Sequence, residues 1–271
     1  MATVDVTVRG GGVFGLSVAW ECARRGARVR VIECTRIGAG SSGGVVGALA
    51  PHVPEQWNAK KQFQFESLVM AGDFWAGIEQ AGGMQTGFAR IGRLQPLADD
   101  AAVNLARART AGAEAHWRAK GEWRVAPVTD FGVLAPETPS GWVVHDTLSA
   151  RANPRQLGPA LVAAIRAKGG EIVVGEGADE GAVVWATGVE GLGALSEAFG
   201  KQVGNGVKGQ AAILEFDAGA APQVFANGLL VVPHANGTVA VGSTAEKNFD
   251  APDTTDAQLD DVLLRIRALC P

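Results

Sequence analysis

The sequence has few of the residues that build metal sites, disulfide frameworks and hydrolytic centres. It contains three cysteines and four histidines in 271 residues, and the cysteines form neither a CxxC pair nor a cluster. Neither a zinc or other metal site nor a disulfide framework is therefore predicted. No Ser/His/Asp constellation and no pair of carboxylates stands out, which counts against a hydrolase.

Long apolar runs and basic clusters are also absent. No stretch reaches the roughly 18 apolar residues of a membrane-spanning helix, and the N-terminus lacks the pattern of a signal peptide. The net charge is −4, with 24 basic and 28 acidic residues, and no basic cluster exceeds two or three residues. Neither nucleic acid nor a membrane surface is therefore expected as a partner. We expect a cytoplasmic protein with a small-molecule partner, and homo-oligomerisation is left open.

Glycine, by contrast, is abundant, with 37 residues in the chain. Residues 3–9 alternate, residues 13–25 carry a helical pattern and residues 28–33 alternate again, which predicts a β-α-β unit. The turn before the helix contains the spacing Gly10-x-Gly12-x-x-Gly15. In such a turn the first glycine permits the tight bend, the second admits a pyrophosphate, and the third lets the helix pack closely on the sheet.

Glu33 closes the second predicted strand, eighteen residues after Gly15. At this position a carboxylate accepts hydrogen bonds from a ribose diol and disfavours a 2′-phosphate. The glycine spacing alone is a weak signal. Together with the preceding strand, the following helix and the acid at the right distance, it predicts a dinucleotide-binding site.

Residues 36–57 form a long irregular segment that is rich in glycine. Ser41 and Ser42 can donate hydroxyl groups to a phosphate, and the glycines allow backbone to lie against a flat ligand. A nicotinamide-binding domain has no need of such a loop, which argues against a plain NAD-dependent dehydrogenase. A flexible surface linker is the alternative interpretation.

The rest of the chain mixes helical and strand-like patterns. A core-facing helix is predicted over residues 60–82 from five apolar side chains at helical spacing, Phe65, Leu68, Val69, Trp75 and Ile78. Further strands are predicted at 87–97, 122–127, 171–174, 182–188, 208–216, 228–233 and 238–243, and further helices at 98–118, 153–170 and 254–270. Asn153 is expected to cap the helix at 153, and Thr254 or Thr255 the last helix.

Six segments, in this order, resemble the D-amino-acid oxidase family of flavoproteins, and the glycine oxidases of thiamine biosynthesis look most similar. They are GGGVFGLSVAWECARRGARVRVIE, GAGSSGGVVGALAP, ANPRQL, VVWATG, VKGQ and VVPHANGTVAVGSTAE. The resemblance covers almost the whole chain, and the first two motifs together are far more specific than the glycine spacing alone. It implies non-covalent FAD, a small amine substrate, and dioxygen or an electron carrier as acceptor.

The resemblance also implies an α/β fold, in which a doubly wound, Rossmann-like FAD-binding domain is interrupted by an α+β substrate domain with an antiparallel sheet. We expect the FAD-binding domain at 1–82 and 146–204, the substrate domain at 83–145 and 205–252, and a helix over 253–271. In the family, the arginine that holds the substrate carboxylate lies in a segment after this helix, and the chain stops at Cys270–Pro271. A fragment of a longer polypeptide is therefore expected, with a divergent form that binds flavin incompletely as the alternative.

The resemblance assigns binding roles residue by residue. The pyrophosphate is expected at Gly10, Gly12, Val13, Phe14 and Gly15, the adenosine ribose at Glu33, the phosphates at Arg36, Ser41 and Ser42, the isoalloxazine edge at Gly47, Ala48 and Leu49, the adenine side at Val174, and a second backbone contact at Ala186, Thr187 and Gly188. His52 could reach the substrate side of the ring, and a loop histidine without a role is the alternative. Arg90 and Arg93 border the substrate domain, where a solvated position is the alternative to a substrate role. The chain has no tyrosine, and Leu230 stands where many relatives carry an aromatic side chain.

The implied activity is oxidation of the amine of glycine, sarcosine or a small D-amino acid to an imine, by hydride transfer to flavin. This chemistry requires orientation of the substrate and no acid–base residue. Two alternatives remain, a flavin-binding module or subunit without a complete active site, and a D-amino-acid dehydrogenase that uses an acceptor other than oxygen.

Overall fold

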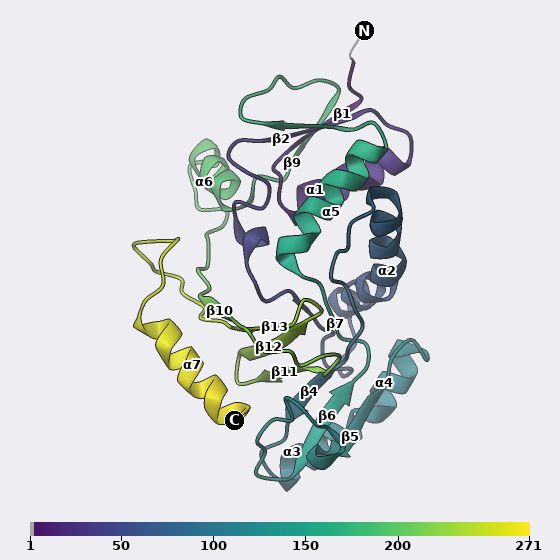
Figure 1. Ribbon diagram of the computed structural model, residues 1–271, viewed down its shortest axis with the longest axis vertical. Coiled ribbons are helices and arrows are strands. Elements are labelled where there is room, and N and C mark those ends of the chain that lie inside the picture. The colour runs from purple at the N-terminus through teal and green to yellow at the C-terminus, as the bar shows by residue number, and fades with distance from the viewer. Residues whose placement is uncertain (1–2) are drawn as a thin grey trace. The chain divides into compact units, whose positions relative to one another are not determined.

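A computed structural model describes residues 3–271 of the chain (Figure 1). The chain divides into two compact units, and each is assembled from separate stretches of sequence. The first unit takes residues 1–44, 74–86 and 153–207, and the second takes 45–73, 87–152 and 208–271.

A four-stranded parallel sheet forms the centre of the first unit, in the order β8-β2-β1-β9. Its strands are β1 (Val6–Arg9), β2 (Val29–Glu33), β8 (Glu171–Val174) and β9 (Ala182–Trp185). Because all four strands run in one direction, their carboxyl ends meet at the same edge of the sheet. The strand order reverses beside β1, and α/β proteins bind their ligands at such a point.

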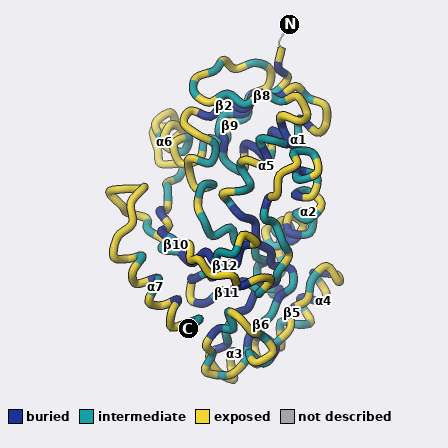
Figure 2. Tube along the Cα trace, in the orientation of Figure 1, coloured by how far each residue is buried: buried dark blue, intermediate teal, exposed yellow. Residues whose placement is uncertain are grey.

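Helices accompany this sheet. They are α1 (Val13–Arg24), α5 (Pro154–Ala167) and α6 (Gly188–Phe199). Helices α1 and α5 lie side by side (Figure 1) and bury apolar faces that include Leu16 and Leu161. As predicted, Asn153 caps α5, since its side chain accepts a hydrogen bond from the Arg155 N–H. Helix α6 has no buried residue, and Figure 2 shows it as largely exposed.

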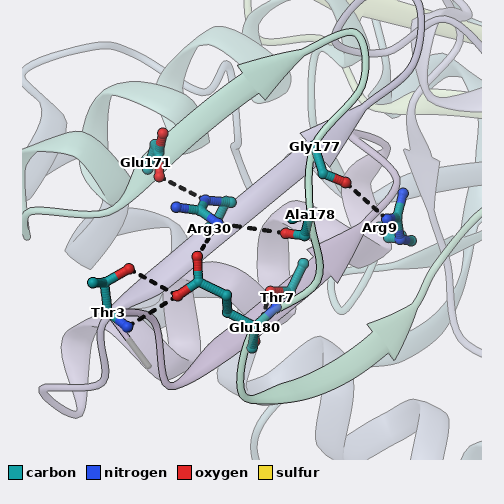
Figure 3. A network of polar contacts seen from close by, with 8 residues as sticks. All are labelled: Thr3, Thr7, Arg9, Arg30, Glu171, Gly177, Ala178 and Glu180. Atoms are coloured by element: carbon teal, nitrogen blue, oxygen red, sulfur yellow. Dashed lines mark hydrogen bonds and ion pairs between the residues drawn. The ribbon is translucent and has the colours of Figure 1, made fainter. Parts of the chain in front are cut away.

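Polar contacts fasten the link between β8 and β9, residues 175–181, to neighbouring strands (Figure 3). The Glu180 carboxylate accepts hydrogen bonds from the Thr3 hydroxyl at 2.8 Å and from Arg30 Nη1 at 2.8 Å. Arg30 also pairs with Glu171 on β8, with 2.7 Å between Nε and Oε2. The Thr7 hydroxyl of β1 donates to the Glu180 carbonyl oxygen at 2.8 Å, so the short link is tied to both β1 and β2.

A seven-stranded sheet forms the centre of the second unit, in the order β10-β13-β12-β11-β4-β6-β5. Its strands are β4 (Arg93–Pro96), β5 (Trp123–Pro127), β6 (Trp142–Asp146), β10 (Ala211–Leu214), β11 (Gln223–Ala226), β12 (Leu229–His234) and β13 (Thr238–Gly242). Neighbouring strands are antiparallel except β4 and β11, which pair in parallel. A separate two-stranded ladder joins β3 (Ala48–Leu49) to β7 (Ala150–Arg151).

Helices α3 (Asp100–Ala108), α4 (Thr110–Trp117) and α7 (Ala257–Leu269) belong to this unit, as does the first part of α2 (Ala59–Gly82). One hydrophobic cluster surrounds Trp117 and includes Phe65 and Leu68 of α2. A second cluster buries Val262 and Ile266 of α7 against residues of the sheet. Helix α7 therefore packs on the sheet through an apolar face.

Several predicted elements differ from the structure. The helix expected over 98–118 is wrong, because the chain forms two helices that meet at Arg109. The predicted cap of α7 is also wrong, since the Asp256 side chain, and not Thr254 or Thr255, accepts the Gln258 N–H. The predicted strand at 87–97 is limited to 93–96. Strands β3, β6, β7 and β11 and helix α6 were not predicted.

The two compact units divide the chain differently from the expected domains, and the assignment of FAD-binding and substrate domains stays a prediction. Residues 45–73 were expected in the FAD-binding domain, and the structure places them in the second unit. The physical reason is that β3 pairs with β7, while Phe65 and Leu68 are buried in the cluster around Trp117.

Two further features concern only residues 3–271. None of the helices described there is long and apolar enough to cross a membrane. In the same residues no group of three or more His, Cys, Asp or Glu side chains is placed to hold a metal ion.

Candidate functional site

The carboxyl edge of the four-stranded sheet gathers segments that are far apart in the sequence. Gly10 follows β1, Glu33 ends β2, Val174 ends β8 and Ala186 follows β9. Many of the residues predicted to bind FAD therefore lie along one edge of the first unit.

The turn between β1 and α1 has no room for side chains at two of its glycines. Gly10 has φ of +110°, and a Cβ there would lie 2.3 Å from the carbonyl oxygen of Ala186. A Cβ on Gly15 would lie 2.0 Å from the carbonyl oxygen of Gly10. At Gly12 a Cβ would meet only the Ser42 side chain, at 3.1 Å from Oγ. Close packing of the protein's own backbone therefore requires glycine at positions 10 and 15, and Gly12 leaves the backbone uncovered for a closely approaching ligand.

Backbone N–H groups in the first turn of α1 have no acceptor within the helix. Its N-cap, Gly12, makes no side-chain cap hydrogen bond, and the first turn contains no acidic residue. The Val13 N–H donates to Ser42 Oγ at 2.9 Å, which places this hydroxyl at the helix terminus. Free N–H groups and the helix dipole at such a terminus favour an anion such as a pyrophosphate.

Glu33 lies buried beside this turn. Its Oε2 accepts the Gly11 N–H at 2.7 Å, and its Oε1 accepts the N–H and the hydroxyl of Thr35 at 3.0 Å each. Burial alone would raise the pKa of Glu33, but these hydrogen bonds outweigh burial and hold the pKa below its ordinary value. An ionised carboxylate accepts hydrogen bonds only, so it suits the two hydroxyl donors of a ribose. The turn and this carboxylate together fit the pyrophosphate and ribose of a dinucleotide such as FAD.

Other residues predicted to bind FAD also lie around this edge, but they are more exposed or make fewer hydrogen bonds than Glu33. Phe14 is 82% exposed, so its side chain does not enclose the turn. Val174 is exposed, and so are Arg36 and Ser41. Thr187 precedes α6 without making a side-chain cap hydrogen bond, and Gly188 opens that helix with φ of +62°. The roles assigned to these residues stay predictions.

Gly47, Ala48 and Leu49 belong to the second unit. Gly47 has φ of +64°, and its carbonyl accepts the Ala152 N–H at 2.9 Å. Ala48 and Leu49 form β3 and line a pocket of about 430 Å³. The complete lining is Ala48, Leu49, Ala50, Gln64, Ser67, Leu68, Arg93, Phe225 and Leu230.

Secondary structure explains how this pocket wall is assembled. Gln64, Ser67 and Leu68 share one face of α2, because residues three and four positions apart are neighbours on a helix. Phe225 on β11 pairs directly with Leu230 on β12. Strand β11 also pairs with β4, which brings the Arg93 guanidinium to 5.8 Å from the centre of the Phe225 ring.

Arg93 is the charged residue of this wall. Its Nε donates to Asp146 Oδ2 at 2.9 Å, and the two residues are direct partners across β4 and β6. Asp146 is fully buried, and its Oδ1 accepts the Ser149 N–H at 2.8 Å. The pairing of β4 with β6 places Arg93 beside Asp146, and the Ser149 N–H fixes the Asp146 carboxylate.

His52 lies beside this wall without being one of its lining residues. Its backbone N–H donates to Gln64 Oε1 at 2.9 Å, which orients the glutamine amide. A catalytic role for the His52 imidazole stays a prediction.

The lining includes residues to which sequence reasoning gave no role. Gln64, Ser67 and Phe225 were not singled out, and Arg93 was considered only as a residue bordering the substrate domain. The helical spacing of positions 64, 67 and 68 was a readable signal for one shared face. The pairing of β4 with β11, which brings Arg93 and Phe225 together, leaves no local signal in the sequence.

Comparisons with known proteins bear on the fold and on the family of the chain. The bifunctional protein ThiO/ThiG of Nostoc sp. is 33% identical over 96 residues, which are 35% of this chain and 15% of that protein. The structure is similar to glycine oxidase from Bacillus cereus, with a TM-score of 0.78, 17% identity and coverage of 99% of this chain and 78% of that one. It is also similar to iminodiacetate oxidase from Chelativorans sp. BNC1, with a TM-score of 0.76, 17% identity and coverage of 98% and 79%.

At such low identity the structural likeness concerns the fold, and it confirms the predicted α/β class with a parallel Rossmann-like sheet and a mixed, mostly antiparallel sheet. The matched curated relative is covered only in a small part of its length. The family itself follows from the sequence profile of the FAD-dependent oxidoreductases named DAO, which matches residues 5–271. The chain therefore belongs to the DAO family of FAD-dependent oxidoreductases.

Proposed function

We propose that the chain binds FAD non-covalently and oxidises the amine of glycine, sarcosine or a small D-amino acid to an imine. The observation that carries the proposal is the glycine-rich turn from Gly10 to Gly12, which leads into the N-terminus of α1 and lies beside the buried Glu33 carboxylate. Few ligands other than a dinucleotide need a pyrophosphate cradle and a ribose acceptor at this spacing.

Three groups of this chain would hold the cofactor in the first unit. The backbone around Gly12 and the Ser42 hydroxyl would face the pyrophosphate, and Glu33 would accept the ribose hydroxyls. When bound, FAD supplies a two-electron acceptor for a hydride from the α-carbon of an amine. The protein then has to bind and orient the amine and to keep water from the reacting atoms.

The pocket of the second unit supports a small amine as substrate. Its volume of about 430 Å³ lies within the range of small-molecule sites, and apolar side chains dominate its lining. The names of two similar structures designate oxidases of glycine and of iminodiacetate, which are both small amines that carry carboxylates.

The test is a visible absorption spectrum of the purified protein, followed by anaerobic addition of glycine, sarcosine and D-alanine. We expect two flavin bands that one of these amines bleaches. The Gly12→Val variant should lose the bound colour, because its side chain would enter the space at the turn. The Gly193→Ala variant is the matched control, since a Cβ at Gly193 on α6 meets nothing within 4 Å. A colourless protein that takes up no added FAD would overturn the proposal.

The same experiment separates two classes of electron acceptor. Rapid return of the flavin bands on admission of air indicates an oxidase. Slow return in air, with rapid return on addition of a quinone, indicates a dehydrogenase. Bands that none of the amines bleaches would leave a flavin-binding module without a complete active site.

A further inference from the structure

The two oxygens of the Glu33 carboxylate are unequally occupied by donors of the protein itself. Oε2 accepts one hydrogen bond, from the Gly11 N–H at 2.7 Å. Oε1 accepts the N–H and the hydroxyl of Thr35 at 3.0 Å each, and the Cys34 S–H is directed to the same oxygen at 3.7 Å. Each carboxylate oxygen has two lone pairs. Oε2 therefore keeps a free acceptor position, whereas both positions of Oε1 are taken.

A ribose diol that donates to both oxygens of Glu33 at once needs a free position on each. The N–H groups of Gly11 and Thr35 are parts of the backbone and stay in place. The Thr35 hydroxyl, by contrast, can leave Oε1 by rotation about one side-chain bond. Thr35 is exposed, so water can become the new partner of the released hydroxyl. This hydroxyl can therefore be exchanged for a ribose hydroxyl at little cost.

We propose that the Thr35 hydroxyl occupies the place of a ribose hydroxyl on Glu33 Oε1 and leaves it when the cofactor binds. Thr35 is then a positioning residue, which keeps the buried carboxylate hydrogen-bonded in the free protein and competes with the cofactor for it. The contact between a ribose and Glu33 rests on the proposed function, and the exchange at Thr35 goes beyond it.

The competing explanation is that the Thr35 hydroxyl only supports the Glu33 side chain. Loss of a supporting hydroxyl would weaken the binding of every nucleotide by the same factor. Loss of a competing hydroxyl would strengthen binding, and only for a nucleotide that carries the hydroxyl that replaces it. The sign of the effect and its dependence on the ligand therefore separate the two explanations.

The ligands of the test are ADP, 2′-deoxy-ADP and 3′-deoxy-ADP, because ADP contains the adenosine ribose and the two phosphates of FAD without the flavin. We would measure the affinity of the full chain for each by titration calorimetry, and by displacement of FAD where flavin is bound.

Three variants complete the design. Thr35→Ala removes the hydroxyl, opens the space beside Oε1 and keeps the backbone N–H. Thr35→Ser restores the hydroxyl. Thr3→Ala is the matched control, since the Thr3 hydroxyl donates to another carboxylate of the same unit, that of Glu180, at 2.8 Å.

Thr35→Ala should bind ADP about twofold to tenfold more tightly than the wild type, as expected when one competing hydrogen bond is removed. One of the two deoxy compounds lacks the hydroxyl that meets Oε1. For that compound, the loss of affinity relative to ADP should be larger in Thr35→Ala than in the wild type by the same factor. Thr35→Ser and Thr3→Ala should behave as the wild type does.

Three results would overturn the proposal. They are weaker or unchanged ADP binding by Thr35→Ala, equal losses for both deoxy compounds in the wild type and in Thr35→Ala, and absence of ADP binding to the wild type.

Failure of the exchange at Thr35 is distinguishable from failure of the proposed function. The predicted effects of Thr35→Ala, in a protein whose flavin no amine bleaches, would support the exchange while refuting amine oxidation. A flavin that an amine bleaches, in a protein whose ADP affinity does not depend on Thr35, would refute the exchange while supporting the enzyme.

Discussion

Glu33 shows how single residues prepare the edge of the parallel sheet for a ligand. Its side chain is buried, yet N–H groups of Gly11 and Thr35 keep its pKa low. The carboxylate is therefore already ionised and oriented before a ligand arrives, so little reorganisation is needed when hydroxyl donors bind.

We expect Glu33→Gln to weaken FAD binding by about tenfold to a hundredfold, since a hydrogen bond to a charged acceptor contributes about 1.5–3 kcal/mol. The measurement is the quenching of FAD fluorescence on titration with the protein. Glu171→Gln is a suitable control, because Glu171 is an exposed carboxylate of the same sheet that pairs with Arg30. Equal affinities of Glu33→Gln and wild type would show that Glu33 serves the turn and not the cofactor.

At the scale of elements, helix α2 contains glycines whose surroundings differ sharply. A Cβ on Gly77 would meet nothing within 4 Å, whereas a Cβ on Gly82 would lie 2.8 Å from the backbone nitrogen of Ala164. Gly82 therefore permits close contact between the end of α2 and α5, and Gly77 has no such function.

Gly77→Ala should stabilise the protein by about 0.5–1 kcal/mol, because alanine is the better helix former in a helix interior. Gly82→Ala should destabilise it by about 1–3 kcal/mol through overpacking. Urea unfolding midpoints of the two variants, measured side by side, test both statements. A lower midpoint for Gly77→Ala would mean that this part of α2 is packed more tightly than the structure shows.

Local signals explain which elements were predictable. Helix α5 was correctly predicted because Asn153 and Pro154 mark its start within the sequence itself. Strand β7 is two residues long and exists through its pairing with β3, so no periodicity could reveal it. The break at Arg109 between α3 and α4 left only a weak signal, because Thr110 and Gly112 are poor helix formers within an otherwise alanine-rich stretch.

The same distinction applies to the candidate sites. The glycine turn and Glu33 lie within one β-α-β unit, so their spacing in the sequence already indicated a shared edge. The pocket wall depends on the pairing of β4 with β11, whose residues Leu94 and Val224 are 130 positions apart. Long-range pairing of this kind has no short-range pattern, and Arg93 could not be placed beside Phe225 from sequence.

At the scale of the whole molecule, low pH should weaken the contacts of two carboxylates near β1 and β2, and with them the stability of the fold. Hydrogen bonds from the Thr3 hydroxyl and from Arg30 lower the pKa of Glu180 from 4.5 to about 2. Arg28 likewise lowers the pKa of Asp5 from 3.8 to about 2. A carboxylate whose pKa is lowered by folding stabilises the folded state above its unfolded pKa, and the stabilisation is lost as pH falls through the folded pKa.

The contribution of these two carboxylates to the free energy of unfolding should therefore stay constant from neutral pH down to roughly pH 5. It should fall between about pH 4.5 and 2, as the two groups become protonated. Glu180→Gln should flatten part of this decline, whereas Glu190→Gln on the exposed helix α6 should not. Urea unfolding midpoints across a pH series provide the measurement. A decline of equal steepness in wild type and Glu180→Gln would contradict the role of Glu180.

The interleaving of the two units has a consequence for biosynthesis. Strand β2 ends at Glu33, and its neighbour β8 begins at Glu171, 138 positions later. At a translation rate of about 5–20 residues per second, the ribosome needs roughly seven to thirty seconds to deliver that neighbour. Over this interval the nascent β2 keeps an open edge, which is a template for pairing with other chains. The yield of folded protein should therefore depend on chaperones that shield this edge during translation.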